Sequence, residues 1–264
     1  MMKPAELFDL SGKTALVTGG SSGLGFQIAQ ALAAAGARVV ISSRSAENLR
    51  DAQGVLRAGG LEVEYIAADN SDERDLVRLA DEALSGLGKV DILVNNAGGT
   101  AGGPAEDHSL EEWDRLMSLN VRALFVLSQR VAKTSMIPNR YGRILNVASI
   151  AGLRGVAGNV AYATSKAAVI SLTQNLAVEW GPYGITVNAL APGLFPSKMT
   201  ARVFDAFGVE RFANATPLRR IGDDEDLMGA ALLFVSRGGK HITGQTLAID
   251  GGISAAMEGE PKPD

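Results

Sequence analysis

Short runs of apolar and β-branched residues alternate along this chain with longer segments of helical pattern, and this alternation restricts the fold more than any other feature. Apolar strands separated by helices indicate parallel strands joined by right-handed crossovers, with helices on both faces of the sheet. The expected strands are TALVTG (14–19), RVVIS (38–42), EVEYIAA (62–68), DILVNN (91–96), RILNVAS (143–149), TVNALA (186–191) and TLAID (246–250). The expected helices lie near 24–35, 45–58, 72–86, 110–135, 160–181 and 223–236. The pattern therefore predicts an α/β fold: a doubly wound parallel sheet of about seven strands.

The organisation of the chain into domains follows from its length and its uniform composition. No proline-rich linker or change of composition divides the 264 residues, which are compatible with one α/β domain. We therefore expect a single domain over 1–264. Two segments depart from the regular alternation. Residues 193–217 form an apolar insertion, and residues 255–264 form a charged, proline-bearing tail that we expect to be flexible.

Composition and charge argue against several classes of function. The net charge is −4 and no Lys/Arg cluster stands out, so a nucleic-acid partner is not expected. Nowhere do 18 apolar residues run together, and the first residues lack the apolar core of a signal peptide, so we expect neither a membrane span nor export. The chain has no cysteine, and its two histidines, His108 and His241, show no ligand spacing, so no metal site is expected. These features are typical of a cytoplasmic protein.

A glycine-rich turn, TGGSSGLG at 18–25, joins the first expected strand to the first expected helix. Glycines there permit a tight turn and let a pyrophosphate approach the main chain, while the helix N-terminus supplies unpaired N–H groups. The alternative is a βα turn that binds nothing. The strand–turn–helix position favours a nucleotide site. The expected contacts are Gly19, Ser21, Ser22, Gly23, Leu24 and Gly25.

The end of the second expected strand bears on which dinucleotide such a site would take. An acidic residue there binds the ribose 2′-hydroxyl of NAD, whereas a cation accommodates the 2′-phosphate of NADP. Ser43 and Arg44 occupy this position, and no carboxylate does. A guanidinium binds phosphate through two parallel hydrogen bonds, and Ser43 adds a hydroxyl. A solvated surface arginine is the alternative. The sequence therefore predicts NADP (NADPH), with NAD less favoured.

Tyr162 and Lys166 stand four residues apart in an expected helix, so their side chains share one face. A phenol has an ordinary pKa near 10, and a nearby cation favours the phenolate and lowers that pKa. A tyrosine of this kind gives a proton to a carbonyl oxygen or removes one from an alcohol. A half-buried tyrosine beside a surface lysine is the alternative interpretation.

These motifs occur together in one known family. The spacing T-G-x-x-x-G-x-G at 18–25, N-N-A-G at 95–98 and Y-x-x-x-K at 162–166 resembles the short-chain dehydrogenase/reductase family, and the resemblance extends from Leu10 to Gly252. It implies a Rossmann-type fold and a nicotinamide cofactor. The segments LFDLSGKTALVTGG and APGLFPSKMT are similar to bacterial 3-oxoacyl (β-ketoacyl) reductases, including the rhamnolipid-associated branch, and to the gluconate 5-dehydrogenase group.

The resemblance also implies roles for individual residues. Ser149, which lies 13 residues before Tyr162, is expected to hydrogen-bond the substrate oxygen, and the main chain of Asn120 to hold a water linked to Lys166. Tyr162 and Lys166 would also contact the nicotinamide ribose. The further expected cofactor contacts are Asp69 and Asn70 at the adenine, Asn96 and Gly98 in the N-N-A-G motif, Pro192, Gly193 and Ser197 at the carboxamide, and Phe195 against the nicotinamide ring.

The insertion at 193–217 resembles the mobile substrate lid of that family. Its apolar side chains favour a hydrophobic substrate, although a packed apolar loop is the alternative. Arg154 and Lys198 are candidates to receive an anionic group of the substrate, although solvated surface charges are the favoured interpretation of both. Relatives usually form oligomers through the helices expected here at 110–135 and 160–181. The resemblance therefore implies a homo-oligomer, a tetramer or a dimer.

The sequence thus predicts an NADP-dependent oxidoreductase that interconverts a carbonyl and a secondary alcohol of a small molecule. The favoured substrate is a 3-oxoacyl compound or another hydrophobic ketone. A polyol, a sugar acid or a steroid-like alcohol is the alternative within the enzyme class. A scaffold protein that senses the cofactor without turnover is the alternative outside it, and the presence of Tyr162 and Lys166 disfavours it.

Overall fold

The seven apolar runs form the strands of one parallel sheet in the order β3-β2-β1-β4-β5-β6-β7. The computed structural model describes residues 3–197 and 199–256, so Lys198 and residues 257–264 of the expected tail lie outside the described residues. The strand order changes direction between β1 and β4, which places a crevice at the carboxyl ends of these two strands. The strands are β1 (Thr14–Thr18), β2 (Arg38–Ser43), β3 (Val63–Ala67), β4 (Ile92–Asn95), β5 (Gly142–Val147), β6 (Ile185–Pro192) and β7 (Thr246–Ile249).

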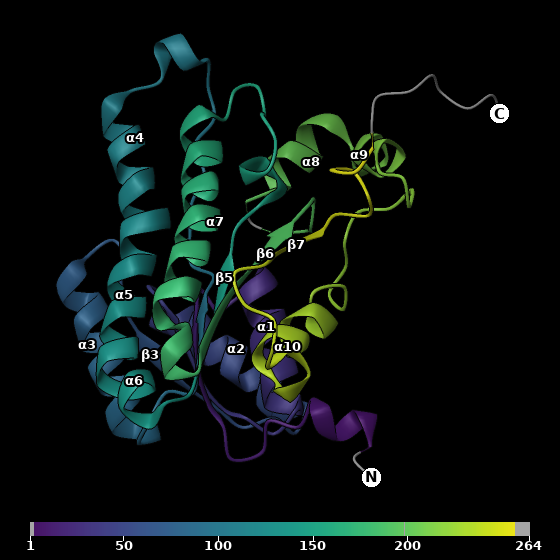
Figure 1. Cartoon of the computed structure of the whole chain (residues 1–264). Coiled ribbons are helices and arrows are strands. Elements are labelled where there is room, and N and C mark those ends of the chain that lie inside the picture. The colour runs from purple at the N-terminus through teal and green to yellow at the C-terminus, as the bar shows by residue number, and fades with distance from the viewer. Residues whose placement is uncertain (1–2, 198, 257–264) are drawn as a thin grey trace.

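Helices cover both faces of the sheet (Figure 1), and each face has its own apolar core. One core contains Ile28, Leu49 and Phe234, which come from α1 (Gly23–Ala34), α2 (Ala46–Ala58) and α10 (Met228–Val235). The other contains Leu79 and Leu127, from α3 (Glu73–Leu87) and α5 (Ala123–Val131), together with residues of α7 (Val160–Trp180). The predicted doubly wound α/β fold is therefore confirmed. In the described part of the chain, no helix is both long enough and apolar enough to cross a membrane.

Side chains at the helix ends explain where several of these helices begin. Ser45 accepts a hydrogen bond from the main-chain N–H of Asn48 before α2, and Asp72 accepts one from Arg74 before α3. Such caps satisfy main-chain donors that the first helical turn leaves free. The last expected helix, 223–236, begins only at Met228, because the residues before it form a turn in which the Asp226 carboxylate binds the main-chain N–H of Asp223.

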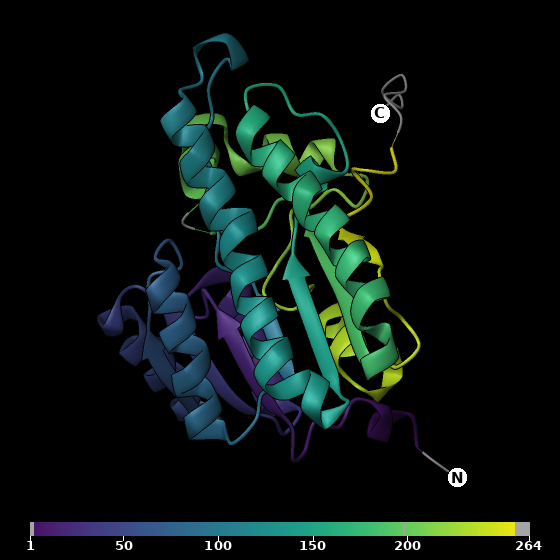
Figure 2. The ribbon, with the colours of Figure 1, turned by 60° about the vertical axis from the view of Figure 1, so that its left-hand side comes forward.

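The segment expected as one helix over 110–135 is interrupted twice by π-helical turns. These are η3 (Ser118–Arg122) and η4 (Ala132–Met136), and they separate α4 (Leu110–Met117), α5 and α6 (Ile137–Asn139). A π-helical turn contains one residue more than an α-helical turn and is frequent at functional sites. Figure 2 shows this long segment (teal) beside α7 (green) across one face of the sheet. Asn120, a candidate site residue, lies in the first of the two π-helical turns.

The insertion at 193–217 contains two short helices that the sequence pattern did not predict. They are α8 (Ala201–Phe207) and α9 (Val209–Ala215), separated by Gly208 with φ +77°. The rings of Phe204 and Phe212 lie 5.6 Å apart, centroid to centroid, and hold the two helices together. Figure 1 shows both helices beyond the carboxyl ends of β6 and β7. The apolar residues of the insertion thus pack partly against each other.

A chain of buried amides and hydroxyls links β4 and β5 to the helices above them. The Asn95 amide donates to Ser128 Oγ at 2.9 Å and to Asn146 Oδ1 at 2.9 Å, and Asn146 donates to Thr173 Oγ1 at 2.9 Å. Asn95 and Asn146 are also register partners in the sheet. Buried polar groups of this kind are stable only when every member is paired. The network holds the carboxyl ends of both strands, where the site begins.

Candidate active site

The glycine-rich turn is packed so closely against the sheet that side chains would not fit at two of its positions. Gly19 has φ +66° and Gly23 has φ +55°, which residues with a side chain rarely adopt. A Cβ at Gly19 would lie 2.6 Å from Asn96 Nδ2, and a Cβ at Gly25 would overlap the same amide and the Gly19 carbonyl. The Ser22 side chain does not cap α1. The turn therefore presents main chain and the positive end of a helix to the crevice, which suits a phosphate group.

Thr18 and Asn96 together brace this turn. Asn96 Nδ2 donates to the carbonyls of Thr18 (2.9 Å) and Gly19 (3.2 Å). The buried Thr18 hydroxyl accepts from the main-chain N–H groups of Asn96 (3.0 Å) and Ala97 (3.1 Å). The sequence placed Thr18 in the glycine motif but gave it no role of its own. Its position as the last residue before the glycines was the signal available.

The residues expected at the adenosine end of the cofactor lie on two adjacent strand ends. Ser43 ends β2 and is the register partner of Ala67 at the end of β3. Arg44 follows as an exposed side chain, and no ion pair within 3–197 and 199–256 involves it. Asp69 Oδ1 accepts from the N–H (2.9 Å) and the hydroxyl (2.8 Å) of Ser71, while Asn70 is half-buried. One Asp69 oxygen is thus used to shape its own loop.

The four predicted catalytic residues converge from three elements. Tyr162 and Lys166 lie on α7, Ser149 follows β5, and Asn120 lies in η3. The Ser149 hydroxyl accepts from the main-chain N–H of Ala151 at 3.1 Å and lies close enough to the Tyr162 phenol to lower its pKa. Lys166 Nζ donates to the Val147 carbonyl at 2.8 Å and lies 5.8 Å from the centroid of the Tyr162 ring. The structure therefore brings the hydroxyl, the phenol and the ammonium group to the carboxyl end of β5.

Two glycines allow this close arrangement. A Cβ at Gly98 would lie 3.0 Å from Asn120 Oδ1 and 3.6 Å from Lys166 Nζ, which places the N-N-A-G turn against both side chains. A Cβ at Gly152 would lie 2.7 Å from the Lys166 carbonyl carbon. The short turn after Ser149, η5 (Ile150–Gly152), thus packs directly on the main chain of α7. A side chain at Gly152 would push its turn away from α7, and one at Gly98 would require the Asn120 side chain to shift.

Burial sets the pKa values of the two titratable groups. It raises the pKa of the Tyr162 phenol above its ordinary value of 10.0, and the Ser149 hydrogen bond only partly opposes this shift. Burial lowers the pKa of Lys166 from 10.5 to about 8. The direction for Tyr162 is opposite to the one expected from the sequence. The reason is that the phenol is desolvated, while the ammonium group is held by the Val147 carbonyl rather than by the phenol oxygen.

The segment after β6 carries the residues expected at the nicotinamide end. A Cβ at Gly193 would lie 2.7 Å from Asp250 Cβ, and one at Gly23 would lie 3.7 Å from Ser197 Cβ. Ser197 thus lies beside the glycine turn, and its hydroxyl pairs with Thr200 Oγ1 at 3.0 Å. Pro192 is the last residue of β6. Phe195 is 3% exposed, and its ring contacts the main chain at Gly222, so its neighbours in the structure belong to the core.

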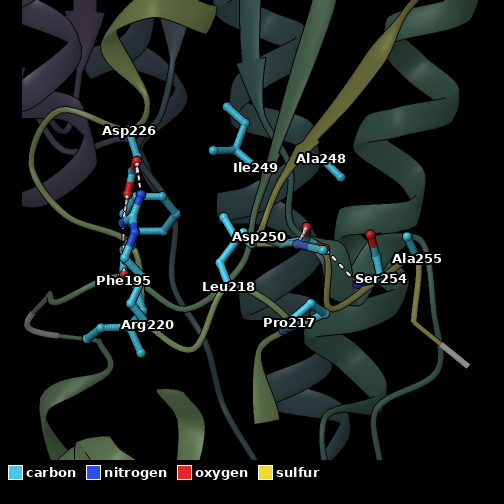
Figure 3. A pocket seen from close by; sticks show the side chains of 14 residues that line it. Phe195, Pro217, Leu218, Arg220, Asp226, Ala248, Ile249, Asp250, Ser254 and Ala255 are labelled. Atoms are coloured by element: carbon cyan, nitrogen blue, oxygen red, sulfur yellow. Dashed lines mark hydrogen bonds and ion pairs between the residues drawn. The ribbon is translucent and has the colours of Figure 1, made fainter. Parts of the chain in front are cut away.

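A cavity of about 580 Å³ lies behind this segment, at the carboxyl ends of β6 and β7 (Figure 3). Phe195, Leu218 and Ile249 form part of its apolar wall. Figure 3 shows Arg220 turned toward Asp226, with Nη2 donating to Oδ1 at 2.7 Å, and this contact holds the pKa of the Asp226 carboxyl at about 2. None of the four catalytic candidates lines this cavity.

A second hollow, of about 690 Å³, lies between η3, α5 and α7 on the helical face that the sequence associated with oligomer formation. Val121, Phe125 and Leu172 line it, and Phe125 is 38% exposed. The described structure therefore has a partly apolar surface where those helices meet. Arg154, considered for an anionic substrate group, is exposed beyond the turn that follows Ser149.

Comparison with known proteins agrees with this arrangement. The family model for short chain dehydrogenase matches residues 13–207. Gluconate 5-dehydrogenase of Gluconobacter oxydans is 40% identical over 257 residues, which cover 97% of this chain and 100% of that protein. The rhamnolipids biosynthesis 3-oxoacyl-[acyl-carrier-protein] reductase of Pseudomonas aeruginosa is 39% identical over 252 residues, covering 93% and 98%.

A solved structure of a gluconate 5-dehydrogenase from Burkholderia cenocepacia, in complex with NADP and tartrate, superposes with a TM-score of 0.91 at 34% identity and covers 97% of this chain and 100% of that one. Similarity of this extent, together with the match of the family model to most of the chain, establishes the family. The chain belongs to the short-chain dehydrogenase family of oxidoreductases.

Proposed function

We propose that the whole chain acts as one catalytic domain that interconverts a carbonyl and a secondary alcohol with NADP(H). The observation that carries this proposal is the convergence of the Ser149 hydroxyl, the Tyr162 phenol and the Lys166 ammonium group at the end of β5. This convergence lies at the edge of the sheet where the glycine turn meets Asn96. The Burkholderia cenocepacia structure, which contains NADP, supports the choice of cofactor.

The residues present fit a nicotinamide dinucleotide. The turn at Gly19, Gly23 and Gly25 leaves main-chain groups uncovered at the start of α1, where a pyrophosphate would bind. Arg44 is exposed at the end of β2, where it would receive a 2′-phosphate. Ser197 lies beside the turn, where it would hold the nicotinamide end. When bound, the nicotinamide ring supplies or accepts the hydride.

The side chains of the site would supply the proton that the carbonyl oxygen takes up during reduction. The hydroxyls of Ser149 and Tyr162 would both hydrogen-bond the substrate oxygen, and such donors stabilise negative charge that develops there. Because burial raises its pKa, the phenol stays protonated at neutral pH and is suited to donating its proton to a carbonyl oxygen that is being reduced. Lys166 would lie behind the phenol and relay the replacement proton through a water held by the main chain of Asn120.

The substrate class follows from the insertion and from the relatives. Met199 and Phe207 are 42% and 57% exposed on the segment proposed as a lid, and they favour a hydrophobic carbonyl such as a 3-oxoacyl compound. The Pseudomonas aeruginosa relative, a 3-oxoacyl reductase by name, supports this choice. The similarity to gluconate 5-dehydrogenase favours a sugar acid as the second candidate.

The proposal is tested with a panel of 3-oxoacyl thioesters, apolar ketones and sugar acids, following the absorbance of NADPH. We expect wild-type protein to reduce a 3-oxoacyl compound, and Tyr162→Phe to lower kcat by about a thousandfold or more. NADPH binding, measured by fluorescence titration, should stay within about threefold because the ring remains in place. Turnover by Tyr162→Phe at the wild-type rate would contradict the proposed proton donor. Tyr183→Phe, which alters an exposed tyrosine in the short turn that follows α7, is the matched control.

A further inference from the structure

The catalytic helix carries a third hydroxyl group, Ser165, between Tyr162 and Lys166. Ser165 is 0% exposed. Its Oγ donates to the main-chain carbonyl of Tyr162 at 2.7 Å and accepts from Asn120 Nδ2 at 2.9 Å. This one hydroxyl therefore joins the main chain at Tyr162 to the π-helical turn η3.

The Asn120 side chain is also hydrogen-bonded to the loop after β4. Its Nδ2 also donates to the Gly99 carbonyl at 3.0 Å, and its Oδ1 accepts from the Gly99 N–H at 2.8 Å. The two N–H donors of the amide are both used, one on Ser165 and one on Gly99. The neighbouring Gly98 packs toward Lys166 Nζ. The connection thus begins at Tyr162 and returns to Lys166 through the N-N-A-G turn.

The geometry explains why a hydroxyl is needed at this position. A helical serine that donates its O–H to a carbonyl one turn earlier has its rotamer restricted, and a lone pair of its oxygen then points away from its own helix. In Ser165 that lone pair meets the Asn120 amide. Without it, a buried N–H of Asn120 would have no acceptor, and relaxation of η3 would move Gly99 and Gly98 as well.

We propose that Ser165 is a positioning residue for the proton-transfer site. It holds the Asn120 turn and the main chain at Gly98 and Gly99 at a set distance from Tyr162 and Lys166. This inference rests on the proposed function and deepens it. Ser165 acts through its neighbours, because both of its hydrogen bonds are made within the protein.

The same helix offers a matched control at Thr173. This residue is 0% exposed, its Oγ1 donates to the Val169 carbonyl at 2.8 Å, and it accepts from the Asn146 amide at 2.9 Å. The hydrogen bonding is the same in kind, about two turns further along α7. Thr173, however, connects to the sheet and not to the turn that contacts Lys166. Comparing the loss of each hydroxyl therefore distinguishes an effect on the positions of the site residues from an effect on the packing of α7.

The test compares Ser165→Ala with Thr173→Val, each of which removes one buried hydroxyl. We expect Ser165→Ala to lower kcat about tenfold or more, because small displacements of reacting groups have large effects on rate. Its pH–rate profile should shift, while NADPH affinity should stay within about threefold. The exchange of the Gly99 amide, followed by NMR, should become faster because its Asn120 acceptor is less firmly held. Thr173→Val should lower the melting temperature and reduce kcat less than Ser165→Ala does, and it should keep the wild-type pH profile and Gly99 exchange rate.

The inference is overturned if Ser165→Ala keeps the wild-type kcat and Gly99 exchange rate. It is equally overturned if Thr173→Val loses as much kcat and Gly99 protection as Ser165→Ala, since the effect would then be one of packing. Failure of the proposed function looks different: wild-type protein would reduce none of the carbonyl compounds. The exchange measurement needs no turnover, so it would still report whether Ser165 holds Gly99.

Discussion

Lys166 is an ammonium group almost completely removed from water, with one hydrogen bond to a carbonyl and no carboxylate partner among the described ion pairs. Removing a charge from water disfavours it, which is why the pKa falls to about 8. The sequence identified Lys166 from its spacing to Tyr162. It did not show the desolvation, because burial depends on the loops around Gly98 and Gly152 that pack over the helix.

The buried lysine predicts a pH dependence of stability. Between pH 8 and 10.5 the unfolded chain holds a proton that folded Lys166 has lost, so the contribution of this group to the free energy of unfolding rises with pH. That contribution is present above pH 10.5 and is lost as the pH falls through about 8. We expect the stability of wild-type protein relative to Lys166→Met to rise by about 2 kcal/mol between pH 7 and 9.5. Denaturant titrations measure it, and parallel pH curves for the two proteins would contradict it. The raised pKa of Tyr162 acts with the opposite sign, but only above pH 10.

Arg44 gives a second prediction at the residue scale. Because it is exposed and outside the described ion pairs, it is available to a 2′-phosphate. We expect Arg44→Ala to weaken NADPH binding about tenfold or more and to leave NADH binding within about twofold. Fluorescence titration with both dinucleotides measures this. Arg50→Ala, an exposed arginine on α2, is the control, and equal loss of affinity for both dinucleotides would remove the argument for NADP.

At the scale of elements, the glycine turn is held by paired hydrogen bonds rather than by its glycines alone. The Thr18 hydroxyl accepts two buried N–H groups, whereas the buried hydroxyl of Thr186 on β6 has no partner in the described part of the chain. We expect Thr18→Val to lower the free energy of unfolding by about 2 kcal/mol and to weaken NADPH binding. Thr186→Val should be neutral or stabilising. Thermal or denaturant unfolding of both variants measures the difference, and equal effects would show that the Thr18 bonds contribute little.

The strands could be predicted from the sequence, because apolar β-branched runs bounded by helices leave few alternatives for residues such as those of β4 and β5. The π-helical turn around Asn120 could not, because the extra residue leaves the apolar spacing of the segment nearly unchanged. The helices α8 and α9 were missed for another reason. Phe204 and Phe212 are placed by contact with each other, so no single apolar face repeats over a longer segment.

At the scale of the whole molecule, the motifs predict the candidate site residues, but the distances between these residues depend on the tertiary structure. Ser149 and Tyr162 come from different elements, and their contact depends on the packing of η5 against α7. The role of Phe195 depends in the same way on tertiary structure, since Gly222 lies far along the chain and receives its ring. The spacing of the motifs indicates which residue types carry the chemistry, whereas the packing of the elements sets the distances between their side chains.

The surface over η3, α5 and α7 predicts the state of the molecule in solution. A partly apolar hollow that includes the exposed Phe125 would be covered by a second copy in the proposed homo-oligomer. We expect wild-type protein to sediment as a dimer or tetramer and Phe125→Asp to sediment as a smaller species. Val55→Asp, which alters an exposed residue of α2, should leave the size unchanged. A wild-type monomer in analytical ultracentrifugation would contradict the expectation.

The paired asparagines of β4 and β5 have a consequence for how the site is assembled. Asn95 and Asn146 face each other only in one alignment, and a slip of one residue would turn both amides out of the network. The loops carrying Gly98 and Ser149 leave the sheet within a few residues of this pair. A sheet in which β4 and β5 were misaligned would leave these buried amides unpaired, so it would be less stable than the correctly aligned sheet. The amide pair therefore favours one alignment of β4 and β5, and this alignment sets the positions from which the loops carrying Gly98 and Ser149 leave the sheet.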